Sequence, residues 1–290
     1  MDKLHQCNSR ITIALISGGF HPCMVREWND IEVEELSLKF ETSSAEEILK
    51  WALNELHPKV ALAFSGQAED VVILDLMHKV APDKVRVFMV DTGRLPEEIY
   101  ELVDEVRSRY GVNIEVYYPD TREVEEVISK FGPNLFYRGI EYRLLCCRVR
   151  KVNPLMRILK DLDAWITGLR RDQYPTRAIT RKIQIDHDHY GILKISPICD
   201  WTWEEVWGYI KRNNLPYCRL YDRGFTSIGC EPCTRPTFAK PGDVTGEELR
   251  KGRWWWERDA PKECGMHCSL EAGTFERHME TIFKLNLKKN

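Results

Sequence analysis

An apolar run leads directly into a polar turn in Val60-Ala61-Leu62-Ala63-Phe64-Ser65-Gly66-Gln67-Ala68-Glu69-Asp70. The run Val60–Phe64 is short and apolar, which is typical of a strand buried inside a sheet. After the turn, we expect Val71–Val80 to continue as a helix. A strand that leads into a helix through a turn is the basic unit of an α/β sheet.

The same unit recurs further along the chain. Its second turn is Asp91-Thr92-Gly93-Arg94, and Pro96 suits the helix start that follows, because proline lacks an N–H that a first turn would leave unpaired. The repeated order predicts an α/β fold with right-handed crossovers and a mostly parallel, twisted sheet flanked by helices. Its further strands and helices are expected at Val85–Val90, Pro96–Tyr110, Asn113–Tyr117 and Arg122–Phe131.

Further helices and strands are expected before and after these repeated strand-helix units. Ser44-Ala45-Glu46-Glu47 fits a capping box that opens a helix within the helical pattern of Ile31–Leu56. We interpret residues 1–40 as an N-terminal extension used in subunit contacts of a homo-oligomer, and residues 41–290 as one catalytic domain that ends in a mobile active-site segment, 236–290. Further elements are expected as a helical segment at Asn134–Leu159, a strand at Ala164–Thr167, a hairpin or edge strands at Lys182–Ile185 and Ile192–Ile195, and a helix from Thr202 to Asn213.

Composition narrows the class of protein. The 290 residues are 43% hydrophobic and 30% charged, and the net charge of -3 gives no general attraction to nucleic acid or to a membrane. The apolar run Ile11–Ile16 is too short to cross a bilayer and does not form a secretion signal, so we expect a cytoplasmic protein. In that reducing compartment, the ten cysteines are expected to bind metal or to do redox chemistry.

Two turns lie where a ligand is expected. In parallel sheets ligands bind at the carboxyl ends of the strands, so the turns at Ser65 and Asp91 belong to the expected binding edge. A Ser-Gly turn before a helix offers a hydroxyl and backbone N–H groups to a phosphate or sulfate. Ordinary turn chemistry remains the alternative interpretation.

Two pairs of cysteines suggest a metal centre. Cys230-Glu231-Pro232-Cys233 places two sulfurs on one side of a turn, and the adjacent Cys146 and Cys147 diverge on a helix. Four thiolates from these two places suit the separate corners of a 4Fe-4S cluster. A zinc site and a C-x-x-C redox pair stay open as alternatives.

Another cysteine, Cys264, lies within Lys262-Glu263-Cys264-Gly265-Met266-His267. Flanking groups that can be cationic lower a thiol pKa and favour the nucleophilic thiolate, so Cys264 is the candidate nucleophile. A packed, unreactive cysteine is the alternative. Arginine and lysine also gather at 148–151, 170–181 and 250–258, which indicates a polyanionic ligand, although a solvated charged face is the usual explanation of one cluster.

Five separated motifs together resemble a known family. They are Cys146-Cys147-Arg148-Val149-Arg150-Lys151, Gly168-Leu169-Arg170-Arg171-Asp172-Gln173, Ile228-Gly229-Cys230-Glu231-Pro232-Cys233-Thr234, Gly252-Arg253-Trp254-Trp255-Trp256-Glu257 and the Cys264 motif. In this order they resemble the assimilatory adenylyl-sulfate reductases, which group with the phosphoadenylyl-sulfate reductases. The resemblance covers residues 41 to 268 and implies a fold like that of the adenine nucleotide alpha hydrolases of the ATP-pyrophosphatase type.

The resemblance implies an activity and a set of site residues. Cys264 would attack the sulfur of adenosine 5′-phosphosulfate, AMP would leave, and thioredoxin, acting from another chain, would release sulfite from the cysteine S-sulfonate. A 4Fe-4S cluster would be held by Cys146, Cys147, Cys230 and Cys233. The positions implied for substrate binding are Ser65, Gly66, Asp70, Thr92, Gly93, Lys151, Arg170, Arg250, Arg253 and His267.

Three rival functions remain. The nearest is a reductase of 3′-phosphoadenosine 5′-phosphosulfate, whose restricted members usually lack the two cysteine pairs. An ATP-dependent thiolation or adenylation enzyme would need a Ser-Gly-Gly-x-Asp-Ser loop, from which the loop at Ser65 departs. A nucleic-acid-binding module would need a continuous basic surface, which the net charge disfavours. One departure from the resembled family concerns Tyr174, which stands where serine commonly follows Asp-Gln, and it bears on substrate fit.

Overall fold

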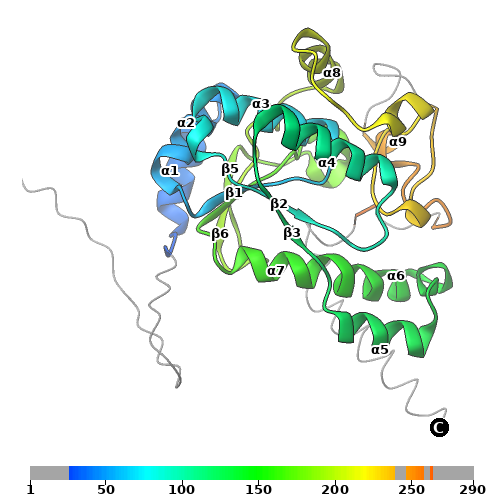
Figure 1. Ribbon diagram of the computed structural model, residues 1–290. Coiled ribbons are helices and arrows are strands. Elements are labelled where there is room, and N and C mark those ends of the chain that lie inside the picture. Colours follow the sequence, from blue (N-terminus) through cyan, green and yellow to red (C-terminus); the bar gives the residue numbers. More distant parts are fainter. Residues whose placement is uncertain (1–25, 239–245, 258–261, 264–290) are drawn as a thin grey trace, which may run out of the picture.

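The computed structural model describes residues 26–238, 246–257 and 262–263. These residues form a six-stranded sheet in the order β3-β2-β1-β4-β6-β5, in which only the β5–β6 pair is antiparallel (Figure 1). The mostly parallel sheet flanked by helices that the sequence predicts is therefore confirmed. The strands are β1 Val60–Ala63, β2 Val87–Val90, β3 Ile114–Tyr117, β4 Ala164–Ile166, β5 Ile183–Asp186 and β6 Ile192–Ile195.

The helices follow the expected alternation closely. Ser44 and Glu47 form the predicted capping box at the start of α2, and Thr202 caps α8 with Glu205 in the same way. Helix α3 begins at Ala68, a few residues before the apolar stretch that marked it in the sequence. The helices are α1 Asp30–Phe40, α2 Ala45–Leu56, α3 Ala68–Val80, α4 Glu97–Tyr110, α5 Thr121–Phe131, α6 Ile140–Cys147, α7 Asn153–Leu159, α8 Trp203–Arg212 and α9 Glu247–Arg250.

Alternation of side chains along the strands builds a core on each face of the sheet. Leu62 and Ile166 point into the core shared with α2, α3 and α4, whereas their neighbours Ala61 and Trp165 pack with α7 on the opposite face. Successive strand residues point to opposite faces, so both faces of these strands are buried. Figure 1 shows α3 and α4 on one side of the sheet and α7 on the other.

The segment Asn134–Leu159, expected to be helical throughout, is interrupted. A 3₁₀ turn at Leu135–Arg138 precedes α6, and a π-helical turn at Arg148–Val152 separates α6 from α7. Two residues account for the breaks. Gly139 has a φ of 150° that a side chain would disfavour, and Pro154, in the first turn of α7, has no N–H for a regular helical bond. The π turn carries Arg150 and Lys151 and sets their direction.

Part of the expected N-terminal extension packs onto the core. Trp28, Val33 and Phe40 are buried in the cluster that covers α2 and α3, and the Trp28 indole donates to the Asp163 carbonyl oxygen at 3.1 Å. The remainder of the expected extension, residues 1–25, lies outside the described residues. Within the described parts of the chain, no helix has the length and apolar content needed to cross a membrane.

Candidate active site

A pocket opens where the carboxyl ends of β1, β2 and β4 meet. Its lining includes Ser65 after β1, Thr92 after β2 and Thr167-Gly168-Leu169 after β4, and it encloses about 900 Å³, part of it open to solvent. The chain runs from β1 outward to β2 and β3 and then returns to the other side of β1 at β4. Such a reversal leaves a crevice at the strand ends, which is the common ligand site of open α/β sheets.

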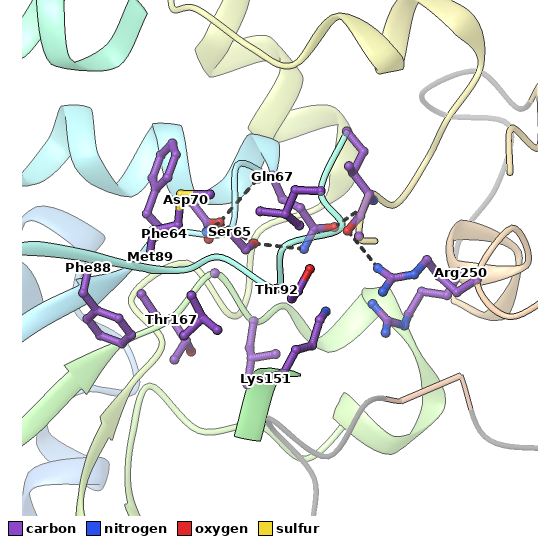
Figure 2. Close-up of a pocket in the computed structure, with 18 of the residues that line it drawn as sticks. Phe64, Ser65, Gln67, Asp70, Phe88, Met89, Thr92, Lys151, Thr167 and Arg250 are labelled. Atoms are coloured by element: carbon purple, nitrogen blue, oxygen red, sulfur yellow. Dashed lines mark hydrogen bonds between the residues drawn. The ribbon is translucent and has the colours of Figure 1, made fainter. Parts of the chain in front are cut away.

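The pocket has an apolar side and a cationic side. Figure 2 shows Phe64, Phe88 and Met89 at one end and Lys151 and Arg250 at the other. An aromatic and aliphatic wall suits a flat heterocycle, whereas guanidinium and ammonium groups suit phosphate or sulfate oxygens. The arrangement therefore fits a ligand that combines a base with an anionic tail.

In the predicted phosphate loop, the side chain of Asp70 accepts hydrogen bonds from the residues of the loop itself. Asp70 accepts hydrogen bonds from the Ser65 N–H and hydroxyl, both at 2.7 Å, and from the Gln67 N–H at 3.4 Å. The sequence predicted that such donors would face an anionic ligand, but in this conformation Asp70 already accepts them. Glycine is required at position 66, between Ser65 and Gln67, because its φ is +77° and an added Cβ would lie 2.6 Å from Ile99.

Burial raises the pKa of Asp70 to about 7, even though its hydrogen bonds to Ser65 act in the opposite direction. The carboxyl of Asp70 therefore changes charge near neutral pH. Arg170, expected to contact substrate, is fully buried behind this loop and outside the lining of the pocket. It donates to Glu69 at 2.9 Å and also pairs with Asp172. Through Glu69, Arg170 holds the turn that follows β1.

Four cations line the other side of the pocket: Lys151, Arg177, Arg250 and Arg253. The sequence analysis assigned a site role to all but Arg177. Arg253 is 4% exposed and donates to the Ile228 carbonyl oxygen at 2.8 Å. Its Nε is buried without a hydrogen-bond partner among the described residues. An anionic oxygen of a ligand in the pocket is the kind of acceptor that would pair with such a buried N–H.

The four cysteines of the two predicted pairs line one small cavity beside the pocket, of about 320 Å³ with part of that space open to solvent. Cys146 and Cys147 end α6, and Cys230 and Cys233 belong to the turn opposite. The surrounding cluster is apolar and aromatic and is separate from the two cores of the sheet. Within the described ranges, no three His, Cys, Asp or Glu side chains are grouped as ligands of a single metal ion.

The cysteine cavity and the pocket share residues. Lys151 lines both, and the Thr92 hydroxyl, in the pocket lining, lies 3.3 Å from the Cys230 sulfur. Burial and the neighbouring Cys230 raise the pKa of Cys146 to about 11 and that of Cys233 to about 12. The thiols therefore lie close enough to affect one another, and an ion bound among them would have to offset their burial.

Two predicted site residues, Cys264 and His267, lie outside the described residues. Gly93 stays in its predicted turn with a φ of +68°, next to the Arg150 guanidinium. Sequence reasoning missed the contacts that hold the segment just before Cys264: Arg143, Tyr174, Arg177 and Glu263. The density of arginine was the only sequence signal for Arg143 and Arg177, whereas Tyr174 was noted only for substrate fit and Glu263 only as part of the Cys264 motif.

Comparisons with known proteins agree with this fold and site. Residues 59–236 match the phosphoadenosine phosphosulfate reductase domain family, and the chain belongs to that family. The resemblance on which the sequence analysis relied is confirmed. A solved structure of phosphoadenylyl-sulfate reductase from Candida auris, as a phosphate complex, is 28% identical with a TM-score of 0.61. It covers 71% of this chain and 97% of that one.

Curated relatives carry a more specific name. The adenosine 5′-phosphosulfate reductase of Burkholderia cepacia is 42% identical over 80% of this chain and 89% of its own length. The reductase of the same name from Pseudomonas aeruginosa strain LESB58 is 42% identical over 81% of this chain and 86% of its own. The chloroplastic 5′-adenylylsulfate reductase 3 of Arabidopsis thaliana is 40% identical, and the match spans 51% of that longer chain.

Proposed function

We propose that this chain reduces adenosine 5′-phosphosulfate to sulfite and AMP in sulfate assimilation. The observation that carries the proposal is that Lys151 lines both the pocket at the strand ends and the cavity of the four cysteines. The names of the curated relatives support the same activity. A base-binding wall and a cationic end suit a nucleotide that ends in a phosphosulfate.

The unphosphorylated nucleotide is the preferred substrate in this proposal. Identity to the bacterial adenosine 5′-phosphosulfate reductases is 42%, against 28% to the solved phosphoadenylyl-sulfate reductase. Both cysteine pairs that the resemblance associates with the unphosphorylated substrate are present and face one cavity. Reduction of 3′-phosphoadenosine 5′-phosphosulfate is the second candidate.

The proposed chemistry begins with the Cys264 thiolate. Its sulfur attacks the sulfur of the phosphosulfate, an S–S bond forms, and the S–O bond to the phosphate breaks. The electron pair of that bond leaves with AMP, and the cysteine carries an S-sulfonate. The cations Lys151, Arg250 and Arg253 stabilise charge on the departing phosphate. Cys264 keeps its ionised form more easily in such a positive environment.

A second reaction releases the product. One thiolate of an external dithiol attacks the Cys264 sulfur of the S-sulfonate, sulfite leaves with the electron pair, and the second thiol displaces Cys264 to close a disulfide in the reductant. The sulfonate is thereby reduced by two electrons as the dithiol is oxidised. We assign this role to thioredoxin or a similar dithiol protein. We place the reaction in the cytoplasm, because that compartment keeps dithiols reduced.

The four cysteines Cys146, Cys147, Cys230 and Cys233 are proposed to hold a 4Fe-4S cluster. The fit is supported by their shared cavity, its apolar walls and the cations Arg94, Arg150 and Lys151 at its edge, which offset a cluster of thiolates. When bound, the cluster supplies fixed charge beside the substrate anion. Lys151 lines both sites, and we assign it the role of orienting that anion and balancing the charge of the thiolates.

Steady-state assays of anaerobically purified protein test the substrate. With thioredoxin and its reductant in excess, sulfite and AMP should form in equal amounts from adenosine 5′-phosphosulfate. The kcat/KM on the 3′-phosphorylated nucleotide should be lower. A clear preference for the 3′-phosphorylated form would instead support the second candidate, and pyrophosphate release from ATP would revive the adenylation alternative.

A further inference from the structure

The residue directly before the proposed nucleophile is held by a buried arginine fork. Glu263 is 2% exposed, and both of its carboxylate oxygens accept from Arg177, Nε at 2.8 Å and Nη2 at 2.7 Å. Arg250 adds a third contact at 3.3 Å. Bidentate arginine–carboxylate pairs combine strength with a fixed geometry, and burial protects this one from screening by salt.

The backbone of the same two residues is fixed as well. The Lys262 carbonyl oxygen accepts from Arg250 Nε at 2.9 Å and Nη2 at 2.6 Å, and the Lys262 N–H donates to the Tyr174 hydroxyl at 3.1 Å. The Glu263 carbonyl oxygen accepts from Arg143 Nη1 at 2.7 Å. These contacts, together with the carboxylate fork, restrain the segment from both sides.

The residues that make these contacts belong to the two sites already described. Arg177 and Arg250 line the nucleotide pocket, whereas Arg143 lies on α6, the helix that ends in Cys146 and Cys147. Tyr174 is one of the residues that depart from the pattern of the resembled family, and its hydroxyl makes one of the backbone contacts. We call Glu263 with Arg143, Tyr174, Arg177 and Arg250 the Glu263 anchor. It connects the chain before Cys264 to both sites.

We propose that Glu263 is a positioning residue that restrains the chain directly before Cys264 and so orients that residue for attack. The proposal rests on the proposed function, in which Cys264 is the nucleophile. Consecutive Cα atoms across a trans peptide are about 3.8 Å apart, so a fixed Glu263 limits where Cys264 can lie. Attack in line with a breaking bond is sensitive to displacements of about 1 Å, and such a displacement costs up to about 100-fold in rate.

A charged Glu263 is required for this role. Burial alone would raise the pKa of Glu263, but Arg250 and Arg177 hold it below its ordinary value. The carboxylate therefore stays ionised at neutral pH and is not available as a proton donor. The alternative role for the same contacts is that Glu263 competes with the substrate anion for the two arginines. The two roles differ in the maximal rate, which falls on loss of the charge only if Glu263 positions the chain.

Single-turnover kinetics of Glu263→Gln separate these roles. Holoenzyme is mixed anaerobically with excess adenosine 5′-phosphosulfate and no reductant, and S-sulfonate formation on Cys264 is followed by intact mass. We expect the maximal rate to fall about 10- to 100-fold, with an unchanged or lower half-saturating nucleotide concentration. Glu263→Asp keeps the negative charge on a shorter side chain, so its maximal rate should lie between those of the wild type and Glu263→Gln. If Glu263→Gln loses the fold, the same comparison is made with Glu263→Asp alone.

Glu115→Gln is the matched control, because Glu115 forms a similar carboxylate pair with Arg86 at the opposite end of the strands. It should leave both kinetic parameters unchanged. An unchanged maximal rate in Glu263→Gln, with tighter nucleotide binding, would overturn the positioning role in favour of competition. An equal loss in the control would also overturn it. Absence of any S-sulfonate in the wild type is a different result, since it would refute the proposed function itself.

Discussion

Asp70 contributes to the charge of the pocket that it lines. It accepts hydrogen bonds from Ser65 and Gln67, whose donors were predicted to face a ligand. Burial raises the pKa of its carboxyl to about 7. Below that pH the carboxyl is neutral, and above it the pocket contains an additional negative charge. Because the proposed substrate is an anion, the charged form of Asp70 opposes its binding.

The half-saturating concentration of adenosine 5′-phosphosulfate should therefore rise as the pH passes upward through about 7. We expect a rise on the order of tenfold, measured by single-turnover kinetics between about pH 6 and pH 9. Asp70→Asn keeps an oxygen that accepts from Ser65 but has no charge to gain, so its profile should be flatter. Asp75→Asn, a buried aspartate of α3 outside the pocket, should keep the profile of the wild type.

The same carboxyl makes stability depend on pH. Its pKa is raised in the folded protein from 3.8, so the folded state binds the proton more tightly than the unfolded state does. The resulting stabilisation is present in full below about pH 4 and is lost as the pH rises through about 7. Chemical denaturation of the wild type and Asp70→Asn across this range should show a difference that grows with pH. A constant difference would contradict the raised pKa.

Single residues differ in how far the sequence reveals them. The sequence singles out the cysteine pairs, Lys151 and Arg253 because their motifs are local, and the structure places them around two adjoining cavities. Their roles there stay predictions. Glu263 and Arg177 could not, because they are 86 residues apart and glutamate and arginine are common on any surface. Only the fold shows that the two are buried together.

At the scale of elements, the cysteine site depends on an irregular helix and a short turn. The predicted continuous helix is broken at Gly139 and before Pro154, and the π turn between α6 and α7 carries Lys151. Apolar runs predicted the strands well because buried strands are uniformly apolar. The π turn has no comparable signal, since it inserts one residue into an otherwise helical pattern.

The two elements that bring the cysteines together should be needed for the cluster. Cys230→Ser removes one proposed ligand, so anaerobically purified protein should lose visible absorbance and bound iron and sulfide, while the fold of the sheet persists. Cys218→Ser is the matched control, because Cys218 is buried in the main core and does not line the cysteine cavity. It should retain the chromophore. Equal iron content in wild type and Cys230→Ser would contradict the assignment of Cys230.

At the scale of the whole molecule, the order of the strands creates the site. β1 lies between β2 and β4, and the crevice at this reversal contains the pocket proposed to bind the nucleotide. The alternation of strands and helices predicted a parallel sheet, but not which strand lies beside β1. That order is set by packing between elements that are distant in sequence, and it decides which turns face one another.

The proposed function is tested most directly by the intact mass of the chain after it is mixed with adenosine 5′-phosphosulfate without a reductant. We expect one SO3 adduct per chain, located on Cys264 by peptide mapping, removed by thioredoxin with release of sulfite, and absent from Cys264→Ser. An adduct on another thiol, or no adduct from protein that still converts the nucleotide to AMP and sulfite, would contradict the proposed mechanism.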